Sequence, residues 1–393
     1  MPKRVIVIRS KPAAHCGRTL NVLRMVQEAG FEARALCWDR SRTRPSTEDL
    51  RGAPVRNSHV PGRYSSKVLL AMVPVWWIRE LFYLLVHGAE CYYAVDLDTG
   101  APALAATVLR KLARRRTCLV YDIADFYTAK AVALPLVLRR PLDALERFIA
   151  GQADVVVMPD AARTYLLGST RPRRVIILPN TPYDLVDPNW KKLDREEFVL
   201  FYAGSLAPHR GIRKLVRVTE ELEKVRVVIA GQTKDPERLA LFERARHVEY
   251  LGLISRAEVV RRTFEADAVY SYYDPVLEIN RTANSTKLYE AMMCGTPVVC
   301  NSEPPSTRVV VETGCGVCLP YDDEEGLRRT ILEWRDNREA AREMGRRGRR
   351  AFEERFNWPA NAQPLVEFLR ERLDEQADPP PAADGTRDGS CAG

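Results

Sequence analysis

Short runs of apolar, often β-branched residues alternate along the first half of the chain with longer segments in which apolar residues recur every three or four positions. The run Val5–Ile8 is followed by a loop over 10–18, a helical pattern that ends at Gly30, and a second apolar run over 31–38. This order predicts a βαβ unit and therefore a parallel sheet. Because ligands bind at the carboxyl ends of such strands, we expect the 10–18 loop to line a cleft.

The same alternation occurs twice along the chain. Further strands are predicted over 91–95, 117–122, 153–158 and 175–178. A polar segment without periodicity follows, and a new series of strands is predicted over 198–203, 225–230, 248–251, 268–272 and 296–300. We therefore predict an α/β protein with two doubly wound, Rossmann-like domains that face each other across a cleft.

The domain boundaries follow from this pattern. We predict a first domain over 1–182, a linker over 183–195 and a second domain over 196–358. A last helical pattern occupies 359–375. The Pro- and Gly-containing tail over 376–393 is expected to be disordered.

Residues 284–299 combine a helix start, a short helix and a strand, and they carry the strongest candidate chemistry. Asn284, Ser285 and Thr286 are residue types whose side chains cap helix amides. Lys287 and Glu290 lie three positions apart and so share one helix face. A helix N-terminus attracts anions. A cation and a carboxylate beside it suit a ligand with phosphate at one end and hydroxyls at the other, such as a nucleotide sugar. The alternative is a capped surface helix with an ion pair.

Charge and hydropathy add two candidate surfaces. Residues 1–190 contain 28 Lys and Arg against 17 Asp and Glu, whereas the remainder is slightly acidic, so the first half is expected to meet an anionic partner. The segment 68–86 is the most apolar, but Pro74, Arg79 and Glu80 interrupt it and it is short for a membrane span. It is either a buried helix or a helix whose Trp76–Trp77 face dips into a membrane interface.

Several classes of protein are disfavoured. The first residues run straight into a predicted strand and lack a signal-peptide pattern. The chain has nine cysteines, an odd number that fits reduced thiols. Both observations favour the cytoplasm. Basic runs without interleaved aromatic residues do not indicate nucleic acid. Asp96 and Asp98 end a strand and are read as helix caps in preference to metal ligands. Cys315 and Cys318 form a single CxxC pair, which we interpret as core and not as a zinc site.

Four motifs together resemble a known family. They are the glycine loop over 202–211, with Arg210 before its last glycine; the strand and glycine of 248–252; the stretch 284–299; and Phe356–Trp358. In this combination the chain resembles the retaining glycosyltransferases of family 4, the glycosyl transferases group 1. The resemblance covers about residues 1–375 and is looser in the first half, at Tyr121–Phe126 and Arg9–Arg18.

The resemblance implies a GT-B fold. The donor nucleotide would lie on the second domain and the acceptor on the first, and the last helix would return toward the first domain. It also implies transfer with retention of anomeric configuration and no required cofactor or metal. By position, Arg210 and Lys287 would hold the diphosphate and Glu290 would accept from the ribose hydroxyls. Further donor-binding candidates are Gly204, Ser205, Gly252, Glu278, Asn284, Ser285, Thr286 and Leu288, and the acceptor-side candidates are His15, Arg18 and Asp125.

Three positions differ from the family pattern. Thr282 stands where a glutamate often faces the donor sugar, Ser205 replaces a second basic residue, and Ala124 replaces a histidine. Glu278, on the same loop as Thr282, is a candidate substitute. We expect the phosphate and ribose contacts to be kept and the sugar contacts to be altered.

We therefore expect a glycosyltransferase that uses a UDP- or GDP-linked sugar and a glycan, lipid-linked or small-molecule acceptor. It would be cytoplasmic, with a membrane surface as a further candidate partner. The alternatives are an inactive nucleotide-sugar-binding or scaffold relative and a sugar-nucleotide epimerase.

Overall fold

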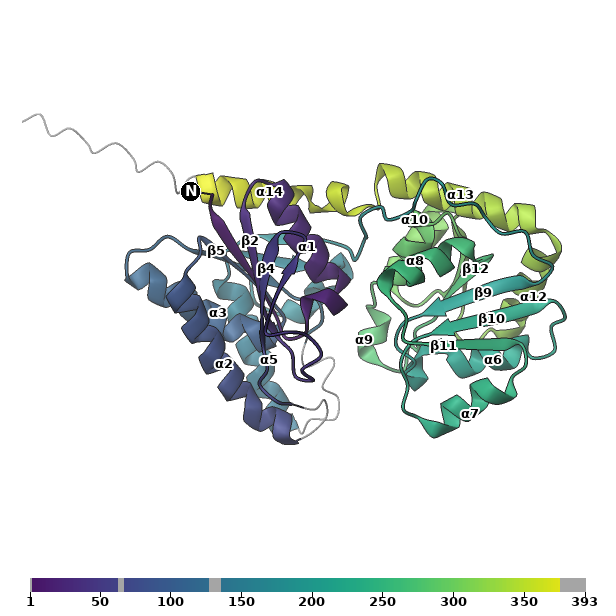
Figure 1. The fold of residues 1–393 in the computed structure, drawn as a ribbon, viewed down its shortest axis with the longest axis horizontal. Helices are drawn as coiled ribbons and strands as arrows, with labels where there is room; N and C mark the ends of the chain where they lie inside the picture. The colour runs from purple at the N-terminus through teal and green to yellow at the C-terminus, as the bar shows by residue number, and fades with distance from the viewer. Residues whose placement is uncertain (1, 63–66, 127–135, 375–393) are drawn as a thin grey trace, which may run out of the picture.

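The computed structural model describes residues 2–62, 67–126 and 136–374, which form two α/β domains (Figure 1). The tail predicted to be disordered, 376–393, lies outside the described residues. Residues 183–195, between the two domains, contain no helix or strand.

The first domain is built on an eight-stranded sheet with the order β3-β4-β2-β1-β5-β6-β7-β8. Its strands are β1 (Arg4–Arg9), β2 (Glu32–Trp38), β3 (Thr47–Leu50), β4 (Ala53–Ser58), β5 (Cys91–Val95), β6 (Cys118–Asp122), β7 (Val155–Met158) and β8 (Val175–Ile177). Its helices are η1 (Ala13–His15), α1 (Gly17–Glu28), α2 (Lys67–His87), α3 (Leu97–Leu112), α5 (Leu136–Gln152) and η2 (Ala161–Leu167). All pairings are parallel except β3 with β4, a hairpin that the sequence pattern had not predicted.

Both faces of this sheet are covered, which explains why its strands read as continuous apolar runs. Val5 and Val7 of β1 point to the face covered by α1, whereas Ile6 and Ile8 point to the face covered by α2, α3 and α5. The β1–α1 connection over residues 10–16 therefore lies at the carboxyl ends of the strands, as expected.

The second domain is a six-stranded, fully parallel sheet with the order β11-β10-β9-β12-β13-β14. Its strands are β9 (Phe198–Ala203), β10 (Val225–Ala230), β11 (Val248–Gly252), β12 (Ala268–Ser271), β13 (Val298–Asn301) and β14 (Gly316–Leu319). Its helices are η3 (Pro208–Arg210), α6 (Ile212–Thr219), α7 (Pro236–Arg244), α8 (Arg256–Glu265), α9 (Glu278–Arg281), α10 (Thr286–Met293), η4 (Pro305–Thr307), α11 (Arg308–Thr313), α12 (Glu324–Asp336) and α13 (Arg338–Glu354).

The last helix, α14 (Trp358–Asp374), runs back along the first domain (Figure 1). Trp358, Leu365 and Leu369 are fully buried in the same cluster as Val5 and Val7 of β1. The first domain is therefore assembled from both ends of the described chain.

The apolar helix α2 turns its tryptophans inward. Trp76 is fully buried and stacks on Trp38 with ring centres 5.4 Å apart. The indole N–H groups of Trp76 and Trp77 both donate to the carbonyl oxygen of Asp98 at 3.0 Å. The alternative in which these tryptophans dip into a membrane is therefore wrong. Within the described ranges, no helix combines the length and hydropathy needed to cross a bilayer.

Candidate functional site

Glycines let the backbone close tightly where three strands of the second domain end. Gly204 follows β9 and donates its amide to the carbonyl oxygen of Ala230 at 3.0 Å. Gly231 follows β10 with φ of 154°, and a Cβ there would lie 2.1 Å from the carbonyl oxygen of Gly204. Its amide donates to Gly252, at the end of β11, at 2.8 Å. A Cβ on Gly204 would lie 3.8 Å from Lys287 Nζ, so the bare backbone at this glycine faces that ammonium group.

Two cations meet over one aromatic ring beside this glycine. Arg210, at the end of η3, places its guanidinium carbon 4.3 Å from the ring centre of Tyr273. Lys287, in the first turn of α10, places Nζ 5.0 Å from the same centre and donates to the Tyr273 hydroxyl at 3.2 Å. Arg210 also donates to Asn280 Oδ1 at 3.4 Å. Among the described residues, no carboxylate forms an ion pair with Arg210 or Lys287, whereas Arg9, Arg18 and Arg256 each have a carboxylate partner.

The electrostatics of this cluster favour a bound anion. Burial acts to raise the pKa of Tyr273, but Lys287 and Arg210 outweigh it and the pKa lies below the usual value. Burial acts to lower the pKa of Lys287, but the phenols of Tyr273 and Tyr202 outweigh it, so the ammonium stays charged at neutral pH. Among the described residues, the partners of these two cations are aromatic rings, the Tyr273 hydroxyl and the Asn280 side-chain oxygen, and none of them is a carboxylate.

The start of α10, where Lys287 stands, adjoins the same cluster. Ser285 occupies the N-cap position, but its side chain forms no capping bond, contrary to the expected role. Its hydroxyl is instead 2.9 Å from Ser271 Oγ and 3.2 Å from the Tyr273 hydroxyl. The amide of Leu288, expected to face the ligand, donates to the carbonyl oxygen of Ser285 at 3.2 Å. Thr286 is exposed, so the N-terminal end of α10 is open to solvent and not closed by a side chain.

Glu290 lies one turn further along α10 and is buried. Its Oε1 is 3.0 Å from the guanidinium of Arg256, the first residue of α8. A Cβ on Gly17 of the first domain would lie 3.0 Å from Arg256 Nη1. Arg256 therefore fixes the Glu290 carboxylate at the junction of the domains, and sequence reasoning had not singled it out.

Two other predicted donor-side residues lie at the junction as well. Asn284 Oδ1 accepts the Asn180 amide at 3.0 Å, and its backbone oxygen accepts from the Asn180 side chain at 3.1 Å. Glu278, exposed on α9, accepts from the Tyr165 hydroxyl of the first domain at 3.3 Å. Ser205 is exposed in the glycine loop, where its hydroxyl accepts the Ala207 amide at 3.4 Å.

Arg163 of η2 joins two of the positions that differ from the family pattern. Its side chain is buried and donates to the carbonyl oxygen of Thr282 at 2.8 Å. It also donates to the carbonyl oxygen of Ala124 and, at 3.2 Å, to Asp125 Oδ1. Asp125, an acceptor-side candidate, is therefore bound by an arginine that spans the two domains.

The other acceptor-side candidates have different surroundings. Arg18 is buried and forms two hydrogen bonds with Asp122, at 2.7 and 2.9 Å. It also donates to Leu178 O and Asn180 Oδ1. This guanidinium is used within the first domain and is not displayed to a ligand. His15 is exposed at the end of η1.

The acidic pair after β5 is not a helix cap in the expected sense. Asp96 stands at the N-cap position of α3 without a capping bond; its carboxylate is 2.9 Å from Arg9 Nη1 and accepts the Asp125 amide at 3.0 Å. Asp98 accepts from Arg40 at 3.1 Å. Both carboxylates are bonded to arginines, and the described part of the chain contains no group of three or more His, Cys, Asp or Glu side chains that could hold a metal.

Tyr273 is the main residue that sequence reasoning missed. It lies two positions beyond the end of β12, where the strand-end rule for parallel sheets would have marked it. The aromatic run Tyr270, Tyr272 and Tyr273 reads as core; all three side chains are buried, but only Tyr270 and Tyr272 belong to a described hydrophobic core cluster.

Comparison with known proteins identifies what the second domain resembles. Residues 187–351 match the family described as Glycosyl transferases group 1. An uncharacterized glycosyltransferase of Methanocaldococcus jannaschii is 23% identical over 195 residues, which is 48% of this chain and 48% of that protein. The chain thus matches about half the length of this curated relative.

Solved structures extend the similarity to both domains. Sucrose-phosphate synthase of Thermosynechococcus elongatus superposes with a TM-score of 0.73 at 15% identity, over 95% of this chain and all of that one. Anabaena HepE, solved with UDP-glucose, gives a TM-score of 0.67 at 15% identity, over 94% of this chain and all of that one. At these identities the match concerns the fold, and the fold is GT-B.

Proposed function

We propose, from the premise that residues 187–351 match the Glycosyl transferases group 1 family within a GT-B fold, that the protein transfers a sugar from a nucleoside-diphosphate sugar to an acceptor hydroxyl with retention of anomeric configuration. The donor is UDP- or GDP-linked and binds to the second domain, and the acceptor binds to the first. Anabaena HepE, a GT-B protein crystallised with UDP-glucose, supports the class of donor.

The observation that carries the proposal is the pair of cations over Tyr273. Arg210 and Lys287 approach the same ring and have no carboxylate partner among the described residues. Two like charges held together cost free energy unless an anion binds between them. A diphosphate is such an anion, and the open start of α10 adds amide donors and the positive end of a helix dipole.

The same groups fit the chemistry of transfer. Negative charge grows on the nucleoside diphosphate as its bond to the sugar breaks. Donors fixed in advance around that charge stabilise the transition state more than the ground state. Arg210, Lys287 and the α10 amides supply this charge stabilisation with the chain's own residues.

Glu290 is proposed to accept hydrogen bonds from the ribose hydroxyls. Its carboxylate is buried and oriented by Arg256 at 3.0 Å, which leaves the second oxygen for a hydroxyl donor. Gly204, with no side chain, gives the diphosphate close access to the backbone beside Lys287.

The identities of the donor sugar and the acceptor depend on the positions that differ from the family pattern. Arg163 binds the carbonyl oxygens of both Thr282 and Ala124, so an arginine bridge lies where the family pattern has its sugar-facing groups. The acceptor is a glycan, a lipid-linked sugar or a small molecule. The described cysteines are free thiols, which supports a reducing, cytoplasmic location as part of the proposal.

A panel of UDP- and GDP-sugars tests the function directly. We expect one donor to raise the melting temperature and, with an acceptor mixture, to give a glycosylated product. Glu290→Ala should abolish product formation, whereas Glu312→Ala, which removes an exposed carboxylate of the same domain, should not. Donor binding without a product would favour an inactive relative. Release of an altered free nucleotide sugar without an acceptor would favour an epimerase.

A further inference from the structure

The outer face of α2 carries an apolar stripe that is turned to solvent. Val75, Ile78, Phe82, Leu85 and Val86 are 40, 70, 68, 39 and 62% exposed. Their spacing of mostly three or four residues places them on one side of the helix. Single exposed apolar residues are ordinary, but a continuous row along a helix marks an interaction surface.

The stripe continues onto the end of the neighbouring helix. The C-terminal ends of α2 and α3 meet at a shallow hollow of about 440 Å³, lined by Leu85, Val86, Leu109 and Ala113 together with several basic residues and one acidic residue, Glu90. Leu112, in the last turn of α3, is 75% exposed. The apolar surface thus extends over two helices.

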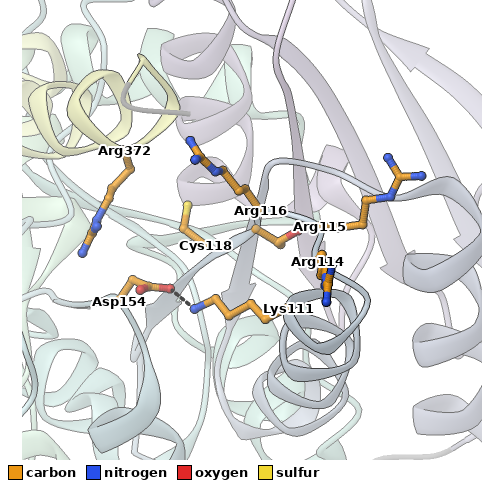
Figure 2. A pocket seen from close by; sticks show the side chains of 8 residues that line it. Lys111, Arg114, Arg115, Arg116, Cys118, Asp154 and Arg372 are labelled. Atoms are coloured by element: carbon orange, nitrogen blue, oxygen red, sulfur yellow. Dashed lines mark hydrogen bonds and ion pairs between the residues drawn. The ribbon is translucent and has the colours of Figure 1, made fainter. Parts of the chain in front are cut away.

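A strongly basic pocket of about 410 Å³ adjoins this hollow, and Arg115 lines both. Its basic residues are Lys111, Arg114, Arg115 and Arg116 at the end of α3, and Arg372 of α14 (Figure 2). The one acidic residue in its lining is Asp154.

The positive charge of the pocket is not cancelled by that acid. Asp154 accepts the Leu119 amide at 2.9 Å and pairs with Lys111 at 3.4 Å and Arg173 at 3.3 Å. Figure 2 shows Lys111 bonded to Asp154, whereas Arg115 projects away from it. On α2 the exposed charge within the stripe is again basic, at Arg79.

We propose that the α2 stripe and the basic pocket together form a membrane-docking face that binds an anionic lipid surface. Lipid supplies both partners at once, because headgroup phosphates attract the arginines and the acyl boundary takes up the apolar side chains. A free phosphate would use the pocket but leave the stripe exposed. A second copy joined by a twofold axis would bring the same basic residues of both copies together.

The position of the face is compatible with a working donor site. Cys118 and Asp154, in the lining of the pocket, lie at the amino ends of β6 and β7. The glycines and cations of the candidate site follow the carboxyl ends of strands in the other domain. Docking through the first domain therefore does not cover the donor site, and the inference does not depend on the proposed activity.

Sedimentation of the full chain with vesicles tests the inference. The protein should bind vesicles of phosphatidylglycerol and phosphatidylcholine but not of phosphatidylcholine alone, and binding should fall as salt is raised. Arg114→Gln, Arg115→Gln and Arg116→Gln combined should lower the affinity on the order of a hundredfold, at about fivefold per arginine. Ile78→Ser with Phe82→Ser should lower it about tenfold or more by removing exposed apolar area.

Matched controls lie in the second domain. Val311→Ser removes a 74% exposed apolar side chain, and Arg244→Gln with Arg246→Gln removes exposed charge; neither should change vesicle binding. Unchanged thermal unfolding should verify that every variant folds. No binding at low salt, or binding that both first-domain variants retain, would overturn the inference. The inference would also be overturned if the protein were a dimer that the double substitution Ile78→Ser and Phe82→Ser converts to a monomer. Tight binding of inorganic phosphate in the absence of vesicles would overturn it as well.

Discussion

Replacing Lys287 by methionine should separate function from stability, because this lysine is placed for an anion and not for the fold. Its ammonium group lies close to the same Tyr273 ring as the guanidinium of Arg210 and forms no ion pair with a described carboxylate. Methionine keeps much of the side-chain volume but carries no charge.

In the unliganded protein, the repulsion between Lys287 and Arg210 and the favourable contacts of Lys287 with Tyr273 make nearly equal and opposite contributions to stability. Both cations lie within about 5 Å of one ring centre, so they are less than about 10 Å apart, and at an effective dielectric constant of 20 they repel by at least about 2 kcal/mol. The lost cation–π contact and the hydrogen bond to Tyr273 are together worth about the same with the opposite sign. The unliganded variant should therefore melt within a few degrees of the wild type.

Ligand binding and turnover should respond very differently. A donor or UDP at about a hundred times its dissociation constant stabilises the wild type by about 2.7 kcal/mol. For a domain of 150–250 residues this is a rise in melting temperature of about 5–10 °C. The variant should lose most of this rise, and its kcat/KM should fall by about 10²–10³, as for other lost donors to a developing charge.

Lys214→Met is the matched control for this experiment. Lys214 lies over the Tyr321 ring at 3.9 Å in the same domain, but it pairs with Asp322 at 3.3 Å. Its loss should lower stability modestly and leave the response to UDP intact. A Lys287→Met protein that keeps activity within about threefold of wild type, or that unfolds while Lys214→Met remains folded, would refute the reasoning.

Three further predictions follow from single contacts. Arg18→Ala should lower the free energy of unfolding by about 3–5 kcal/mol in urea titrations, because Asp122 is then left buried and unpaired; a loss below about 1 kcal/mol would contradict this. In an alkaline titration followed by tyrosinate absorbance, Tyr273 should ionise at a lower pH than an ordinary tyrosine, because Lys287 and Arg210 outweigh the opposing effect of burial on its pKa. UDP should move the Tyr273 titration to higher pH, and Tyr273→Phe should remove it. Gly231→Ala should cost about 1–3 kcal/mol and weaken UDP binding, because the new Cβ meets the Gly204 carbonyl oxygen at 2.1 Å; unchanged UDP affinity by calorimetry would argue against this packing.

Local patterns were sufficient for most of the fold. Apolar runs buried on both faces produce parallel strands, so β9 and β10 begin and end where the pattern predicted. The β3–β4 hairpin was missed because β3 is short, polar and at the edge of the sheet, where little burial shapes its sequence.

The site was predictable only where its residues are local in sequence. Arg210 and Lys287 stand in motifs, and the structure does bring them to one ring. The roles of Arg256 and Arg163 depend on contacts across the two domains, which no periodicity along the chain encodes. Ser285 was read as a cap from its residue type, but a nearby hydroxyl competed for its side chain.

The return of α14 has a consequence for the order in which the protein is made. The first domain is translated first, yet Trp358, Leu365 and Leu369 complete its core and are translated more than 300 residues after β1. While the chain is still being translated, one apolar face of the first domain's sheet is therefore incompletely covered. The second domain is contiguous in sequence and can complete its own core earlier. The domain that begins folding first is the last to finish, and ribosome-bound chains stalled before Trp358 should be the stage most in need of a chaperone.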